Sequence, residues 1–457
     1  MPRPEPPAPT SVLPRDEPAL GMWTATALVV GNMIGSGVFL LPASLGRFGA
    51  VSLVGWLFTV AGAMVLALTF ARLSRMVPRP GGIYAYARIG LGDLPGFLVA
   101  WGYWISICAG NAAIVTALVS YGGFFWTPLA TEPLLGAATA VAVIWFLTWI
   151  NARGVREAGV MQLVTTLLKL APLVVIATAG LLYLDPTNFT PFNTSELSTS
   201  GAVATTATLT LWAFLGLESA TVPAGHVDRP ARTIPRATML GTGLAAVVYV
   251  LGTVAVMGVI PPDRLASSTA PFADAASHMW GAWTARVVAA GAVISCFGAL
   301  NGWILLQGQL PMAAAMDGLM PRLFARRSPR GTPVPALVVS SILVTAIVAT
   351  NYTKGLVSAF TFVILLATLS TLLPYAFSSL SLIRLMLRQR HRNPRELGTG
   401  LATAALALLY SGWAIVGAGR DAVFWGLLLL IAGMPVYVVV TRRAGGESER
   451  LIGSGAE

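Results

Sequence analysis

The chain has 457 residues, of which 56% are hydrophobic and only 10% are charged. A typical soluble domain has about 25% charged residues, so a soluble enzyme of this length would lack the polar side chains to cover its surface. The formal net charge is +11. The arginines lie in short loops between apolar segments, which indicates membrane topology and not a nucleic-acid partner.

Twelve apolar segments are long enough to cross a bilayer, which takes about 20 residues of helix. They lack the roughly ten-residue alternation of a membrane β-barrel, so we expect an all-α integral membrane protein whose surroundings are the lipid bilayer. Residues 1–20 are Pro-rich and polar and predict a disordered cytoplasmic tail, and a second tail is predicted at 442–457. The predicted spans are 23–44, 50–71, 95–122, 134–151, 157–183, 203–225, 237–260, 285–310, 333–350, 356–383, 400–418 and 422–441.

The placement of positive charge predicts the orientation of these spans. With the N-terminus inside, 23 of the 29 lysines and arginines fall in inner loops and tails, and five fall outside. Cytoplasmic loops carry such an excess. Both termini are therefore predicted to be cytoplasmic, in a cell inner membrane.

Two of the spans are interrupted at corresponding places. The first carries Gly31–Gly37 (GNMIGSG) and the sixth carries Trp212–Ser219 (WAFLGLES). They are the first members of two five-helix sets, and Gly-interrupted spans at matching positions are typical of a transporter site. N–H groups after a break attract an anion, and carbonyls before it attract a cation. The alternative is that the glycines only allow close helix packing.

The same residues resemble a known family. Residues 31–42 (GNMIGSGVFLLP) resemble the first helix of amino acid–polyamine–organocation transporters, and residues 211–235 resemble their sixth helix and the loop after it. Three further motifs agree, which are PGGIYAYAR at 80–88, NGWILLQGQ at 301–309 and DGLMP at 317–321. The resemblance covers roughly 22–440 and points to the basic amino acid/polyamine antiporters, particularly the arginine/agmatine and lysine/cadaverine exchangers.

This resemblance implies a fold and a set of domains. The family has a LeuT-type fold with twelve transmembrane helices, in which two inverted five-helix repeats with broken helices 1 and 6 precede two extra C-terminal helices. Here the repeats would be 21–183 and 203–384, and the extra helices 400–441. Many members form homodimers, so a second copy is an expected partner.

The resemblance also implies site residues for a small amino acid or amine substrate. Backbone N–H groups of Ser36 and Gly37 would hold the carboxylate, and the carbonyls of Met33, Trp212 and Leu215 would take the amino group. Other positions match an aromatic lid (Trp212), an aromatic platform (Trp303), polar pocket residues (Asn32 and Asn111), helix-3 pocket residues (Ser106 and Ile107), and an inner gate (Tyr103, Glu218 and Tyr375).

The pocket departs from the arginine exchangers in two places. Ser106, Ile107 and Ile114 replace small and sulfur-containing residues, and a pocket with two isoleucines is less suited to a guanidinium. A helix-10 serine corresponds to Ala367, with Thr368 and Ser370 nearby. For Asn111 the alternative role is a hydrogen bond between helices, because an unpaired amide inside a membrane protein costs free energy.

Two ionisable side chains fall inside predicted spans, Lys169 and Glu218. Intramembrane charges are costly and are functional candidates by default. Glu218 is a candidate protonatable gate, or else a structural hydrogen-bonding group. In more distant members of the superfamily a lysine at the position of Lys169 takes the place of a sodium ion, so Lys169 is either a proton-exchanging group or a fixed tether between helices 1 and 5. Sodium coupling is not expected in either case.

These residues lead to three hypotheses about function. The leading hypothesis is alternating-access exchange of a basic amino acid for its amine or for another amino acid. The alternative is proton-coupled, sodium-independent uptake of neutral or varied amino acids, which Lys169 and the isoleucines favour. An integral-membrane enzyme is disfavoured, because the three histidines and two cysteines form no cluster for a nucleophile or a metal, and no cofactor is predicted.

Overall fold

The computed structural model describes residues 20–354, 356–388 and 393–453, with side chains described outside 351–369 and 443–453. Residues 1–19 of the predicted N-terminal tail and 454–457 of the C-terminal tail lie outside the described residues. Within the described part the chain is helical, and its one β contact is an isolated bridge between Leu20 and Val227. The predicted all-α fold is confirmed.

The elements succeed one another along the chain in this order: α1 (Met22–Met33), α2 (Gly37–Gly46), α3 (Val51–Met76), α4 (Ile83–Leu91), α5 (Asp93–Gly122), α6 (Pro128–Thr131), α7 (Pro133–Arg153), α8 (Val155–Ala179), η1 (Gly180–Tyr183), η2 (Pro186–Phe189), α9 (Thr199–Leu211), η3 (Trp212–Phe214), η4 (Ser219–Thr221), η5 (Ala224–His226), α10 (Pro230–Val259), α11 (Pro262–Ser267), α12 (Pro271–Trp280), α13 (Trp283–Met316), η6 (Arg322–Ala325), α14 (Val334–Lys354), α15 (Leu356–Arg388), α16 (Pro394–Gly417) and α17 (Arg420–Gly453).

The described helices make a multi-span membrane protein. Ten of them are long and apolar enough to cross a bilayer, and α1 with α2 forms a further span bent by 43°. The helix α14 lies where the ninth span was predicted. Its described apolar part, Val334–Thr350, is shorter than each of the ten helices that can cross a bilayer. The multi-span architecture is confirmed, and the count of twelve stays a prediction.

Several boundaries differ from the sequence prediction. Span 6 was predicted over 203–225 with a break at 212–219; its α-helix begins at Thr199 and ends at Leu211, and the chain continues as short 3₁₀ turns. Helix α17 continues to Gly453, past the predicted start of the tail at 442. Hydropathy marks only the apolar part of a helix, so it cannot detect a polar extension or the short helices α4, α11 and α12.

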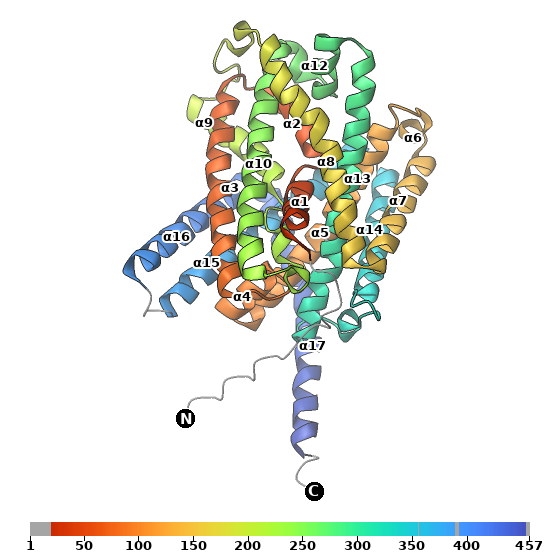
Figure 1. Cartoon of the computed structure of the whole chain (residues 1–457). Coiled ribbons are helices and arrows are strands. Elements are labelled where there is room, and N and C mark those ends of the chain that lie inside the picture. Colours follow the sequence, from red (N-terminus) through yellow and green to blue (C-terminus); the bar gives the residue numbers. More distant parts are fainter. Residues whose placement is uncertain (1–19, 355, 389–392, 454–457) are drawn as a thin grey trace.

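The helix α1 lies at the centre of the molecule (Figure 1), in contact with α8, α10 and α13. Close approach of α13 requires a glycine, because a Cβ at Gly302 would lie 1.9 Å from the Asn32 side-chain oxygen. Helix α4 marks one end of the bundle and α12 the other, and α17 projects beyond the end that carries α4 (Figure 1). The break in the first span is therefore held in the middle of the bundle, away from lipid.

Candidate functional site

The break in the first span leaves backbone groups in the bundle interior. Residues 34–36 are not helical, and the chain resumes as α2 at Gly37. The first N–H groups of a helix have no partner within it, so Ser36 and Gly37 present donors at the positive end of α2. On the other side of the break, the Asn32 carbonyl accepts from Trp303 Nε1 (3.1 Å), and the Met33 carbonyl accepts from the N–H of Gly35 (3.1 Å).

The break in the sixth span lies beside the first one. Gly216 has a φ of +103°, and a Cβ there would lie 2.9 Å from the Trp303 ring and 3.2 Å from Asn32 Cβ. Glycine is therefore required by both the backbone conformation and the close approach. The carbonyl of Leu215 accepts no hydrogen bond within the described part of the chain, whereas that of Trp212 accepts from Leu215. Leu215 thus supplies an oxygen that is available to a cation.

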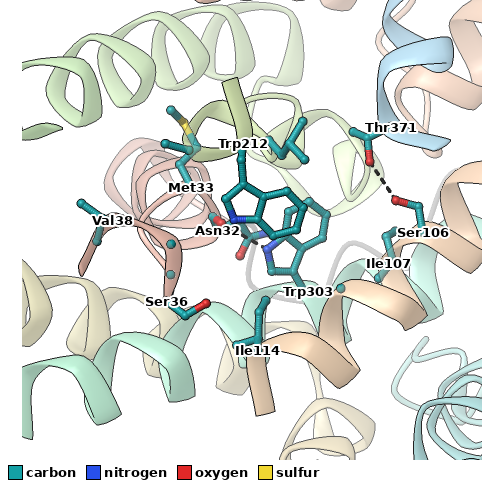
Figure 2. A pocket seen from close by; sticks show the side chains of 15 residues that line it. Asn32, Met33, Ser36, Val38, Ser106, Ile107, Ile114, Trp212, Trp303 and Thr371 are labelled. Atoms are coloured by element: carbon teal, nitrogen blue, oxygen red, sulfur yellow. Dashed lines mark hydrogen bonds between the residues drawn. The ribbon is translucent and has the colours of Figure 1, made fainter. Parts of the chain in front are cut away.

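A cavity of about 50 Å³ lies between the two breaks (Figure 2). A water needs roughly 10–15 Å³ measured in this way, so the space holds only a few waters. A larger ligand requires the surrounding side chains to move. The cavity is lined by Asn32, Met33, Gly35, Ser36, Gly37, Val38, Ser106, Ile107, Gly110, Ile114, Trp212, Ala213, Leu215, Trp303 and Thr371.

The two predicted tryptophans lie on this cavity. Trp212 covers the start of α2, since a Cβ at Gly37 would lie 2.7 Å from its ring nitrogen. Trp303 is anchored by its bond to the Asn32 carbonyl, and its ring meets that of Tyr103 edge-on at 6.4 Å. Figure 2 shows the two indoles one above the other beside Asn32. They offer an aromatic surface to a cation in the cavity.

The side chain of Asn32 joins the two interrupted spans. Its Nδ2 donates to the hydroxyl of Ser219 (2.8 Å), which lies after the second break. Its side-chain oxygen is buried and has no hydrogen-bond partner among the described residues. The bond ties the two breaks together, and the unpaired oxygen is a further acceptor close to the cavity.

A hydroxyl pair lies at the far side of the cavity. Ser106 on α5 and Thr371 on α15 are 2.8 Å apart and both line the space, and Ile107 lies next to Ser106 (Figure 2). Sequence comparison pointed to Ala367, whose side chain lies outside the described residues, so it missed Thr371. The helices α5 and α15 are distant in sequence, so their contact could not be predicted. The one signal in the sequence is that Thr371 is polar and lies at helical spacing from Ala367.

Asn111 is the one predicted substrate-binding residue that is absent from the lining. It is completely buried, and its Nδ2 donates to the side-chain oxygen of Gln307 on α13 (2.8 Å). Gln307 in turn donates to Ser341 on α14 (2.9 Å). The structure thus places Asn111 in a hydrogen-bonded contact between helices, which was the alternative for this residue.

The three residues predicted as an inner gate lie together beside the cavity. Tyr103 on α5 and Tyr375 on α15 both donate a hydrogen bond to the carboxylate of Glu218. All three side chains are buried. The cluster links α5 and α15 across the second break, and the N–H of Gly216 lies 3.5 Å from the Tyr375 hydroxyl. Tyr103 lies nearer the start of α5 than Ser106, which lines the cavity, and its ring contacts that of Trp303.

Lys169 on α8 lies behind the first break and does not line the cavity. Its Nζ donates to the carbonyls of Gly31 and Ile34, both at 2.6 Å, and the side chain is completely buried. The hydroxyl of Ser295 on α13 is within hydrogen-bonding distance of the carbonyls of Ile34 (3.1 Å) and Gly35 (3.2 Å), and its single proton is donated to one or shared between them. These bonds satisfy carbonyls that the break removes from the helix ladder.

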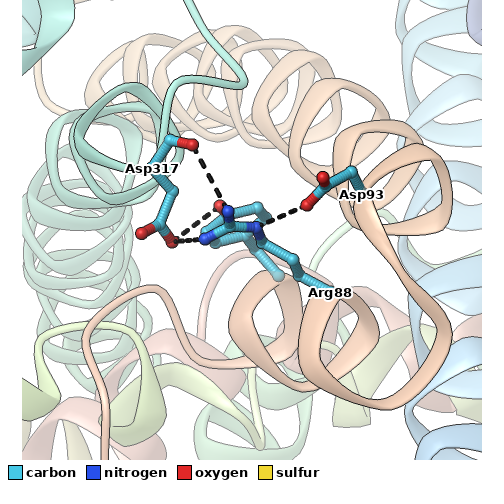
Figure 3. Close-up of polar contacts among 4 residues, drawn as sticks. Arg88, Asp93 and Asp317 are labelled. Carbon is cyan, nitrogen blue, oxygen red and sulfur yellow. Dashed lines mark hydrogen bonds and ion pairs between the residues drawn. The ribbon is translucent and has the colours of Figure 1, made fainter. Parts of the chain in front are cut away.

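A charged cluster lies at the end of the bundle that carries α4, around Arg88, which is not on a spanning helix (Figure 1 and Figure 3). Arg88 pairs with Asp93 at the start of α5 (2.8 Å) and with Asp317 after α13 (2.7 Å), and Tyr84 donates to Asp317 (2.9 Å). Burial alone would lower the pKa of Arg88, but the two carboxylates hold it above its usual range. Arg88 therefore stays charged and ties α4 and α5 to the turn after α13. From sequence Arg88 was assigned only to topology, although it ends the motif at 80–88 and its partner Asp317 begins the motif at 317–321.

Two interrupted helices that meet at a cavity inside a bundle of membrane-spanning helices define a membrane transporter. The family model described as amino acid permease matches residues 20–441. The chain therefore belongs to the amino acid permease family and is a multi-pass transporter, not an enzyme.

Relatives of known name agree with this assignment. The chain is 36% identical to the cadaverine/lysine antiporter of Escherichia coli (strain K12) over 374 residues, 80% of this chain and 83% of that protein. It is 31% identical to the putrescine transporter of Haemophilus influenzae over 424 residues, 92% of this chain and 97% of the relative. The putrescine transporter of Escherichia coli (strain K12) is 30% identical over 427 residues, 93% of this chain and 96% of the relative.

Proposed function

We propose that this permease exchanges a basic amino acid for its decarboxylated amine or for another amino acid. The observation that carries the proposal is the cavity between two helix breaks, with donors from Ser36 and Gly37 on one side and an available Leu215 carbonyl on the other. Relatives named as a cadaverine/lysine antiporter and as putrescine transporters support substrates of this class.

Within this proposal, each wall of the cavity binds a different part of the substrate. The carboxylate takes the N–H groups at the start of α2, where the helix dipole favours an anion. The α-ammonium takes the Leu215 carbonyl. The aliphatic stem lies between Ile107 and Ile114, and the terminal ammonium lies against Trp303. A diamine lacks the carboxylate and leaves the α2 donors without an anion.

The remaining assignments complete this proposal. Residues 21–183 and 203–384 form two inverted repeats of a twelve-helix LeuT-type fold, and 400–441 contributes the two extra helices. The excess of arginine at one side supports a cytoplasmic location for both termini, with the protein in a cell inner membrane. The proposal also keeps the homodimer that the family resemblance implies.

Exchange in proteoliposomes tests the proposal. Labelled lysine, ornithine or arginine should enter vesicles that hold lysine, cadaverine or putrescine, and should not enter empty vesicles. Equal uptake into loaded and empty vesicles would contradict obligatory exchange.

The buried Lys169, bound by carbonyls, favours a second candidate, which is proton-coupled uptake of neutral or varied amino acids. An inward proton gradient should then drive uptake of leucine or alanine into empty vesicles. Uptake that ignores the gradient would remove this candidate.

The Arg88 cluster makes a prediction about access from the cytoplasm. Opening the site on this side requires α4 and α13 to separate, so Asp317→Asn should favour the open state. A partly exposed ion pair contributes about 0.2–1 kcal/mol. Labelling of a cysteine at the buried position Thr221, close to Gly82 at the start of α4, should therefore speed up by about 1.4- to fivefold.

Asp93→Asn is the matched control for this prediction, because Asp93 pairs with the same arginine but does not connect it to α13. Maleimide labelling in inside-out vesicles measures both variants. An equal acceleration by Asp93→Asn and Asp317→Asn would show that the link to α13 has no effect on access.

A further inference from the structure

The residue shortly before α1 connects the starts of α1 and α10. The N–H of Leu20 donates to the carbonyl of His226 (2.6 Å), and the N–H of Asp228 donates to the carbonyl of Leu20 (3.0 Å). These two bonds form the isolated parallel bridge between Leu20 and Val227, which lies shortly before α10. The two helix starts are therefore joined by backbone hydrogen bonds that belong to no helix.

The side chain of Leu20 reaches a third helix, α8. It is buried, and a Cβ at Gly159, near the start of α8, would lie 2.8 Å from Leu20 Cδ2 and 2.8 Å from Thr24 Cγ2. A residue with a Cβ would displace these atoms, so the close approach requires glycine. We call the contacts of Leu20 with Val227 and Gly159 the Leu20 latch.

The latch holds one end of a helix whose other end is a break. Residues 34–36 are not helical, so α1 can turn about the break only if its start is released. At the break, Lys169 on α8 binds the carbonyls of Gly31 and Ile34. The helix α8 thus holds α1 at two places, by a buried cation near the break and by an apolar contact at the start. Separating a buried ammonium from its acceptors costs far more than separating a leucine from a glycine.

We propose that the Leu20 latch closes the transport site on the side where α1 begins, and that this side opens when Leu20 leaves Gly159. The bridge to Val227 stays intact, so α1 and the segment before α10 move as one unit. The two contacts of Leu20 thus have opposite roles, one released and one kept. The inference rests on the proposed exchange and on the cytoplasmic location of the N-terminus.

The face of α1 that such a movement exposes runs along α8. Thr24 contacts Gly159, and the carbonyl of Ala27 accepts from the hydroxyl of Thr166 on α8 (3.2 Å). Thr24 and Ala27 follow each other at helical spacing and so lie on one face of α1. Ala27 is buried, so a cysteine at this position reports whether α1 has separated from α8.

Maleimide labelling of Ala27→Cys in inside-out vesicles, without substrate, tests the contact with α8. Leu20→Ala should speed labelling up about tenfold, because most of a buried leucine side chain is lost. Gly159→Val should also speed it up, because it displaces Leu20 and Thr24. Gly243→Val is the matched control and should leave the rate unchanged, since a Cβ at this glycine of α10 would have no described heavy atom within 4 Å.

Cross-links formed after folding test the opposite roles of the two contacts. A short bifunctional thiosulfonate between Leu20→Cys and Gly159→Cys should lower counterflow of labelled lysine by about tenfold or more, and a reductant should restore it. A disulfide between Leu20→Cys and Val227→Cys should leave counterflow within about twofold of the reduced protein. Paired strands lie about 4.8 Å apart, which suits the Cα–Cα separation of a disulfide. The native Cys108 and Cys296 are buried, and the protein without added cysteines gives the background.

Three results would overturn the proposal. These are equal acceleration of labelling by Gly159→Val and Gly243→Val, unchanged labelling in a Leu20→Ala variant with the wild-type thermal midpoint, and the same counterflow in the two cross-linked proteins. Labelling needs no substrate, so its outcome is independent of the exchange experiment. A protein that labels as expected but takes up equal lysine into loaded and empty vesicles would contradict obligatory exchange and support the latch.

Discussion

Lys169→Met is expected to reduce exchange by up to about a hundredfold. The variant removes the donor to the carbonyls of Gly31 and Ile34 in the bundle interior. A buried acceptor left without a partner costs about 1–3 kcal/mol. The Gly31 carbonyl loses its donor, whereas the Ile34 carbonyl keeps Ser295, and the upper end of this range reaches the roughly 2.7 kcal/mol that corresponds to a hundredfold. Without the lysine, the carbonyls at the first break are no longer held in place. The N–H groups of Ser36 and Gly37 at the start of α2 would then lose their geometry as well.

Counterflow of labelled lysine and the thermal midpoint of the purified protein measure this effect. Lys169→Arg keeps a cation and should retain part of the activity. Arg264→Gln, at an exposed arginine on α11, should change neither quantity. A methionine variant that exchanges at the wild-type rate would rule out the tether. If that variant exchanges normally but loses uptake driven by a proton gradient, Lys169 acts as a proton carrier instead.

The breaks were predictable from sequence because their cause is local. Glycines on both sides of Ser36 weaken the helix at the residues where α1 ends, and Gly216 adopts a φ that other residues rarely adopt. The course of the chain after the second break was not predictable. The segment after Leu215 was expected to resume as helix but forms 3₁₀ turns, because it packs beside Asn32, Trp303 and Tyr375 and not along its own axis.

Residues that meet across the bundle were harder to predict. Thr371 lines the cavity because α15 packs against α5, and nothing local to residue 371 indicates that contact. Asn111 was expected at the pocket from family likeness, but its side chain is turned toward Gln307. The pairing of Arg88 with Asp317 joins positions 229 residues apart, which composition and spacing cannot reveal.

Glu218→Leu is the second large effect we expect, at about a hundredfold in exchange. The carboxylate accepts from Tyr103 and Tyr375, and leucine would leave both phenolic hydroxyls buried without an acceptor. Each costs about 1–3 kcal/mol, and the contact between α5 and α15 beside the cavity would be lost. Glu218→Gln keeps one acceptor oxygen but must place its amide donor against the other phenol, so it should lose about tenfold.

A rescue experiment separates this network from simple packing. Removing both partners of a buried hydrogen bond is often nearly neutral, whereas removing one is costly. Adding Tyr103→Phe and Tyr375→Phe to Glu218→Leu should therefore raise the thermal midpoint above that of the single variant. Adding Tyr249→Phe should not, because that buried hydroxyl donates to the Ala213 carbonyl (3.0 Å) and not to Glu218. If the triple variant regains stability while exchange stays low, the carboxylate itself is needed for transport. If Tyr249→Phe rescues equally, the effect lies in packing and the network has no special role.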